Sequence, residues 1–262
     1  MNLIHNLLQL ISIFSLTSGC VIDPIPCTNL YVCPKVTEIT TCGEGGVDGY
    51  TTYQLSVEIQ PNTNIQNVYA IFGDLHGNDM YWPPVYQMDG PFNSDIGGVS
   101  PSIITIYPEG KYDSWITVGI IDGDPHNKLS TIGVDFNEWN TGKSITTSNG
   151  AVFLIDPEEI LSEKEYVIAQ ITLPSDELHR MDVNVQGKTF DSTSAWTEIG
   201  ISFIIHPMVN TINFPNGCSI WFDGCNLCPI INGQLGMCTG KACSFKETPE
   251  CRLYGYGDLS GH

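Results

Sequence analysis

Basic residues are scarce in this sequence, and their scarcity narrows the range of partners. Lysine and arginine together number 10 against 29 aspartates and glutamates, which gives the 262-residue chain a formal net charge of −19. Nucleic-acid phosphates and anionic membrane surfaces both require a basic patch, so we expect neither as a partner. An acidic balance of this size suits cations, basic partners or salt-rich surroundings, or it serves solubility alone.

Long apolar runs and familiar catalytic motifs are also missing. No stretch approaches the ~18 consecutive apolar residues of a membrane span, so none is expected. The sequence contains no G-x-S-x-G, no HExxH and no glycine-rich phosphate loop, and its histidines are isolated. We therefore assign no catalytic residue and regard an enzyme as the less favoured class.

Cysteine is absent between residues 43 and 217, whereas ten cysteines lie in two clusters outside that range. The first cluster is Cys20, Cys27, Cys33 and Cys42; the second is Cys218, Cys225, Cys228, Cys238, Cys243 and Cys251. Two even-numbered clusters around a cysteine-free core are typical of disulfides formed in an oxidising compartment. Zinc bound by the C-x-x-C pair of the second cluster is the alternative.

The first 19 residues have the pattern of a secretory signal peptide. A short apolar core over 7–16 precedes three small residues at 17–19, although no lysine or arginine precedes the core. We predict a signal peptide over 1–19 and a chain that is secreted, extracellular or on a particle surface. Lipidation of Cys20 is the alternative, because residues 16–20 are similar to a bacterial lipobox.

Alternating and β-branched segments predict strands through the cysteine-free region. Over 52–59, apolar residues fall on one face and polar residues on the other, which indicates a strand with one face toward water. Segments 67–72, 116–121 and 151–155 are apolar on both faces and predict buried strands. Further strands are expected at 103–107, 131–136, 166–173, 181–185 and 199–205.

One helix is expected, over 156–161, where Asp156 can cap the first amides and Pro157 fits the first helical position. About nine strands with so little helix predict an all-β fold, an antiparallel two-sheet sandwich or jelly roll. We place it at 50–210, after a cysteine-containing N-terminal arm at 20–49 and before a small disulfide-rich C-terminal module at 211–262. Parallel βαβ units are excluded because the crossover helices are missing.

The stretch 111–142 lies at the centre of this core and carries its most acidic loop. Asp122 and Asp124, with Asp135 across the hairpin, offer oxygen ligands for Ca²⁺, the one cofactor that the sequence suggests. The alternative is that these acidic turn residues accept hydrogen bonds from backbone amides. Before this stretch, the irregular segment 73–99 carries Tyr81, Trp82 and Tyr86, which either pack as a lid over the sheet or line a binding surface.

Two stretches resemble known modules. The C-terminal pattern Cys-Asn-x-Cys at 225–228, then Cys-Thr-x3-Cys at 238–243, resembles the pacifastin-type inhibitor module. That resemblance implies the pairs Cys225–Cys243 and Cys228–Cys238, which leaves Cys218 to pair with Cys251; sequence alone allows fifteen connectivities. The module departs from the family at Ile230, where the family has a cysteine, and Cys251 is additional. The central YDSW and NGAVF segments resemble an uncharacterised β-rich module of secreted proteins.

The function expected from these features is that of a non-catalytic binding, adhesion or structural component with an extracellular glycan or protein ligand. A polysaccharide-active hydrolase built on the same sandwich is one alternative, and a pacifastin-like protease inhibitor is another.

Overall fold

The computed structural model describes residues 27–40, 46–140, 142–162, 164–191, 194–207, 214–231, 234–235, 238–239 and 248–255. They belong to two units, one up to residue 208 and one from residue 209 onward. The predicted signal peptide and Cys20, Cys42 and Cys243 lie outside the described residues. Within the described part of the chain, no helix has the length and apolar character needed to cross a membrane.

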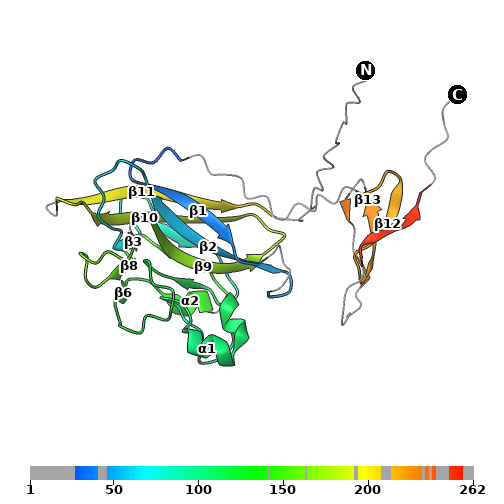
Figure 1. The fold of residues 1–262 in the computed structure, drawn as a ribbon, viewed down its shortest axis with the longest axis horizontal. Coiled ribbons are helices and arrows are strands. Elements are labelled where there is room, and N and C mark those ends of the chain that lie inside the picture. The colour runs from blue at the N-terminus through cyan, green and yellow to red at the C-terminus, as the bar shows by residue number, and fades with distance from the viewer. Residues whose placement is uncertain are drawn as a thin grey trace, which may run out of the picture. The chain divides into compact units, whose positions relative to one another are not determined.

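The first unit is the antiparallel two-sheet sandwich that the sequence predicts (Figure 1). One sheet has the order β1 (Val32–Glu38), β2 (Tyr50–Ile59), β9 (Glu165–Pro174) and β5 (Trp115–Ile116). The second has the order β6 (Leu129–Ile132), β8 (Ala151–Leu154), β3 (Ala70–Phe72), β10 (His179–Lys188), β4 (Met80–Trp82) and β7 (Ile145–Thr147), with β11 (Ala195–Ile205) paired to β10. Side chains of both sheets form one core, among them Leu55, Ile171 and Val183.

The long strands follow the alternation of the sequence. β2, β9 and β10 each span ten residues and contribute their alternate apolar side chains to the core. The predicted N-terminal arm contributes β1, which pairs with β2 along its whole length. The disulfide Cys27–Cys33 ties the chain just before β1 to the start of that strand.

The outer face of β2 is only partly open to water: Glu58 is exposed and Gln54 is half-buried, but the other two residues of this face are covered, contrary to the prediction. Thr52 is 1% exposed and Ser56 is fully buried. The 3₁₀ helix η1 (Pro108–Tyr112) lies against this face: the Thr172 hydroxyl donates to the Tyr112 carbonyl oxygen at 2.6 Å. The hydroxyls of Thr52 and Thr172 lie 2.7 Å apart, which extends the chain of hydrogen bonds into β2.

Residues 103–107 do not form the predicted strand. The chain forms helix α1 (Pro101–Ile106) instead, since Ser100 accepts a hydrogen bond from the Ile103 amide and proline occupies the first turn. No residue of α1 is buried, and Ile106 is 68% exposed. The apolar residues here reflect a short surface helix rather than a core strand.

The helix predicted over 156–161 is also wrong. The Asp156 carboxylate accepts a hydrogen bond from the Glu158 amide at 3.0 Å, which closes a local turn. The carbonyls of Pro157 and Glu159 accept hydrogen bonds from the Asn67 side chain at 2.9 and 2.8 Å. Six residues give little cooperative gain from a helix, and the side-chain bonds from Asn67 stabilise the turn instead.

The stretch 111–142, predicted at the centre of the core, supplies the edge strands β5 and β6 instead, and it forms less strand than predicted. Residues 113–118 are buried, but Ile121 is 48% exposed. β5 ends after Ile116, because the Ile120 amide donates to the Thr117 hydroxyl and Gly119 takes a positive φ of 76°. Ile116 and Val118 are fully buried. The strand expected over 131–136 is β6, which ends earlier, and α2 (Phe136–Asn140) follows it.

The second unit is a small antiparallel sheet in the order β14 (Gln234–Leu235), β13 (Leu227–Ile231), β12 (Cys218–Phe222) and β15 (Glu250–Tyr254). It contains the disulfides Cys218–Cys251 and Cys228–Cys238, two of the three expected pairs. Cys225 is disulfide-bonded as well, and its pairing with Cys243 stays a prediction.

Candidate functional site

The outer face of the second sheet carries an apolar groove of about 390 Å³. Its lining comes from β3 and the residue before it, from β8 and the loop after it, and from β10: Tyr69, Ala70, Phe72, Ala151, Phe153, Leu154, Ile155, Pro157 and Gln186. Ile155 is 61% exposed, and Phe72 and Phe153 are half-buried. Apolar side chains therefore face outward here, where an antiparallel sheet commonly presents polar ones to water.

The groove is hollow because small residues alternate with aromatic ones in neighbouring strands. Ala70 on β3 lies opposite Phe153 on β8, and Phe72 lies opposite Ala151 in the next row. Cross-strand neighbours share a face, so the two alanines form the floor between the two phenylalanines. Gln186 on β10 lies beside Ala70 in the same row and brings a side-chain amide to the groove.

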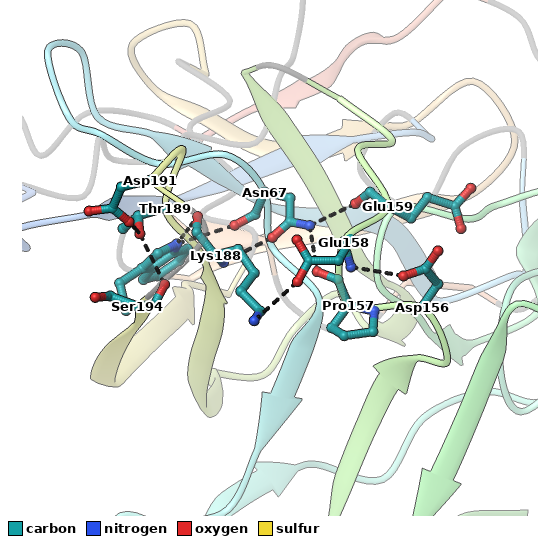
Figure 2. A network of polar contacts seen from close by, with 10 residues as sticks. Asn67, Asp156, Pro157, Glu158, Glu159, Lys188, Thr189, Asp191 and Ser194 are labelled. Atoms are coloured by element: carbon teal, nitrogen blue, oxygen red, sulfur yellow. Dashed lines mark hydrogen bonds and ion pairs between the residues drawn. The ribbon is translucent and has the colours of Figure 1, made fainter.

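The loop between β8 and β9 borders the groove, and Asn67 fixes its position (Figure 2). Asn67 is fully buried; besides donating to the carbonyls of Pro157 and Glu159, it accepts the Lys188 amide at 2.9 Å. Its backbone carbonyl accepts the Trp196 indole N–H at 3.2 Å. One side chain thus joins the loop to the end of β10 through three hydrogen bonds, which hold the groove edge in place.

Ion pairs strengthen the same loop. Lys188 Nζ lies 3.1 Å from Glu158 Oε1, and Lys128 pairs with Glu159 (Figure 2 shows the first pair). Burial raises the pKa of Tyr69, opposed by the nearby Lys188 charge, so its hydroxyl stays protonated and can donate. Both lysines beside the groove already have a carboxylate partner.

Two further hollows adjoin the β8–β9 loop. The larger, about 700 Å³, is lined by Ile160, Lys164 and Phe190 together with the carboxylates Glu58 and Glu165. The smaller, about 300 Å³, includes Leu161 and the acidic hairpin at 122–124. A single loop therefore contributes to all three hollows, but only the groove has a lining without charged residues, so the groove is the candidate functional site.

The carboxylates of the larger hollow share one cation. Lys35 Nζ lies 3.0 Å from Glu58 Oε1 and 2.7 Å from Glu165 Oε2. Burial acts to raise the pKa of Glu165, but the hydrogen bond from Lys35 and its positive charge act in the opposite direction, and the net pKa is lowered. The same carboxylates raise the pKa of Lys35, so the group stays a charged, salt-bridged cluster.

The predicted Ca²⁺ ligands are not brought together. Both Asp124 oxygens accept backbone amides, those of Lys128 at 2.8 Å and Leu129 at 2.9 Å. Asp135 accepts the Asn137 amide at 3.1 Å, and Asp122 is exposed. Among the described residues, the one cluster of three metal-ligand side chains is Asp223, Cys228 and Cys238, whose two sulfurs already form a disulfide.

The aromatics predicted for binding separate into core and loop positions. Trp82 is fully buried in the sandwich core, so its assignment to a binding surface is wrong. Tyr81 lies on β4 and is half-buried. Tyr86 packs against Tyr50 with ring centroids 6.0 Å apart, and its backbone amide donates to Thr172 on β9. These residues do not line the groove.

The YDSW motif is a structural junction. The buried Asp113 carboxylate accepts the Met88 amide at 2.9 Å and the Ser94 amide at 2.7 Å, which fixes the loop after β4. The Ser114 hydroxyl donates to the Tyr86 carbonyl at 2.6 Å. Burial raises the pKa of Asp113 to about 6, with these amides acting in the opposite direction.

No model of a known protein family matches this chain, and no curated protein is significantly similar to it. Function is therefore inferred from the chain's own chemistry. The groove was not singled out from the sequence, although a signal existed: segments 67–72 and 151–155 are apolar on both faces. In an antiparallel sheet, such a segment needs something to cover its outer face.

Proposed function

We propose that this chain is a secreted, non-catalytic binding protein that takes its ligand in the outer-face groove. The observation that carries the proposal is an outward-facing apolar groove on the second sheet, bordered by a loop that a buried asparagine fixes in place. Exposed apolar surface of this kind marks interaction sites in soluble proteins. A preformed groove also lowers the entropy lost on binding.

Secretion is supported by the cysteine chemistry. Three disulfides join described cysteines, and Cys225 is disulfide-bonded as well. Disulfides of this number persist in oxidising compartments, and they agree with the signal-like N-terminus.

The hydrolase alternative receives less support. A glycosidase needs one protonated carboxyl group beside a carboxylate. Glu58 and Glu165 line the same hollow, and Lys35 bridges them. The lowered pKa of Glu165 keeps this carboxyl group ionised near neutral pH, so it cannot act as the acid. No observation favours proton transfer at this pair, so binding is better supported than hydrolysis.

The test is a screen of the disulfide-bonded chain against arrays of extracellular proteins and glycans. Phe153→Ser removes one aromatic wall of the groove, and Ala151→Leu fills its floor. Losing the burial of one phenylalanine, about 1.5–3 kcal/mol, weakens a groove-bound ligand about 10-fold or more. Phe190→Ser, at a 65% exposed phenylalanine of the larger hollow, is the matched control. The proposal would be contradicted if every ligand bound both groove variants with the same affinity as the wild type.

A further inference from the structure

We infer that the groove takes a basic protein segment that carries apolar side chains. The inference rests on the proposed function and names the chemistry of the partner. Of the nine lining residues, only Gln186 and Tyr69 bring polar side-chain groups to the groove. A sugar ring carries several hydroxyls, and each one left without a partner on burial weakens binding. Aliphatic and aromatic side chains of a polypeptide fit this lining without that cost.

Two aspartates follow groove-lining residues closely in the chain. Asp156 follows Ile155 directly and is exposed, and Asp74 lies two residues beyond Phe72. The Asp74 carboxylate lies 3.0 Å from His76 Nδ1, and that hydrogen bond lowers the pKa of Asp74, which keeps it ionised. Lysine and arginine flanking an apolar segment would meet these carboxylates.

The lysines nearest the groove do not reverse this charge. Lys188 pairs with Glu158 and Lys128 with Glu159, so each cation is matched by a carboxylate of the same loop. The whole chain carries a formal net charge of −19, which steers basic partners toward it. A second copy of this chain carries the same charge and is disfavoured as the occupant, and so is any acidic partner.

The experiment uses the full disulfide-bonded chain and four fluorescent probes: a heptapeptide alternating lysine and phenylalanine, its glutamate–phenylalanine and lysine–serine counterparts, and the neutral sugar cellohexaose. Anisotropy titrations compare the wild type with Phe153→Ser, Ala151→Leu and Asp156→Asn. Asp156→Asn keeps an oxygen that can accept the Glu158 amide, so the turn is retained. Circular dichroism checks that each variant is folded.

We expect the lysine–phenylalanine peptide to bind the wild type, with affinity about 10-fold lower in Phe153→Ser and in Ala151→Leu. Asp156→Asn should weaken it about 2- to 5-fold, and raising the salt should lower the affinity. The matched controls Phe190→Ser and Asp191→Asn should leave binding unchanged; Asp191 lies away from Asp156 beside Thr189 (Figure 2).

Three results would overturn the inference. Equal binding of the lysine–serine peptide would mean that general charge attraction, not the groove, holds the probe. Binding of cellohexaose or of the acidic peptide that is lost in Phe153→Ser would assign the groove to another partner, while the proposed binding function would survive. If neither groove variant changes the binding of any probe or of any ligand from the arrays, both proposals fail.

Discussion

Replacing Asp113 by asparagine should remove a defined part of the pH dependence of stability. Asp113 is fully buried, and its carboxylate accepts the backbone amides of Met88 and Ser94. Burial is the main cause that raises its pKa from 3.8 to about 6; the amide bonds oppose this rise and the neighbouring Asp95 charge adds to it. At 1.36 kcal/mol for each pKa unit, the rise corresponds to about 3 kcal/mol.

The direction follows from proton linkage. Because the pKa is higher in the folded state, the folded chain binds more protons than the unfolded chain between about pH 4 and pH 6. The contribution of Asp113 to the free energy of unfolding is therefore fully present below about pH 3.8 and is lost as the pH rises through about 6. Asparagine has a similar shape and does not titrate, so Asp113→Asn loses this contribution.

The measurement is urea denaturation of the wild type and of Asp113→Asn from pH 4 to pH 8. The stability advantage of the wild type should be about 2.4 kcal/mol larger at pH 4 than at pH 7.5, because at pH 4 most but not all of the contribution is present. In addition, Asp113→Asn should lower the free energy of unfolding by about 1–3 kcal/mol at every pH. The asparagine NH₂ group is a donor, so one of the two backbone amides loses its hydrogen-bond acceptor. A difference between the two proteins that stays constant with pH, or grows as the pH rises, would refute the reasoning.

Three further outcomes are expected. Asn184→Ala should lower the free energy of unfolding in urea by about 2–4 kcal/mol, because this buried side chain donates to two backbone carbonyls and accepts one backbone amide; a loss under 1 kcal/mol would contradict this. Gly187→Ala should prevent normal folding, seen as lost thermal cooperativity, since an added Cβ would lie 1.9 Å from the Asn67 carbonyl oxygen. Reduction should unfold the second unit, which contains Cys228–Cys238, while amide-exchange protection of the sandwich core persists; joint unfolding of both units would argue against this.

The sequence could predict the long strands because their signal is local. Alternation over 50–59, 165–174 and 179–188 fixes which side chains face the core, and no distant contact has to be known. The fold class and the disulfide-rich C-terminal unit follow from the same local patterns and from cysteine spacing, whereas the predicted central position of the YDSW stretch is wrong, because β5 is an edge strand.

Short segments were decided by tertiary contacts instead. Residues 156–161 carry helix-start signals, yet Asn67, some 90 residues earlier, takes the carbonyls of Pro157 and Glu159 and holds a turn. Asp124 has a carboxylate that could bind Ca²⁺, but its two oxygens accept hydrogen bonds from the Lys128 and Leu129 amides. Periodicity cannot reveal how one distant side chain competes for a backbone group.

Identifying the candidate site required both the sequence and the tertiary structure. The sequence alone indicated that 67–72 and 151–155 contain strands with apolar residues on both faces, because strand periodicity assigns alternate side chains to opposite faces; the strands themselves are shorter, Ala70–Phe72 and Ala151–Leu154. Only the tertiary structure decided which face was covered. Ile71 and Val152 point into the core and are fully buried. On the opposite face, no described residue fills the hollow between Phe72 and Phe153. Whether an outward apolar face is packed or open depends on which distant segment lies over it, and that is a property of the assembled sandwich.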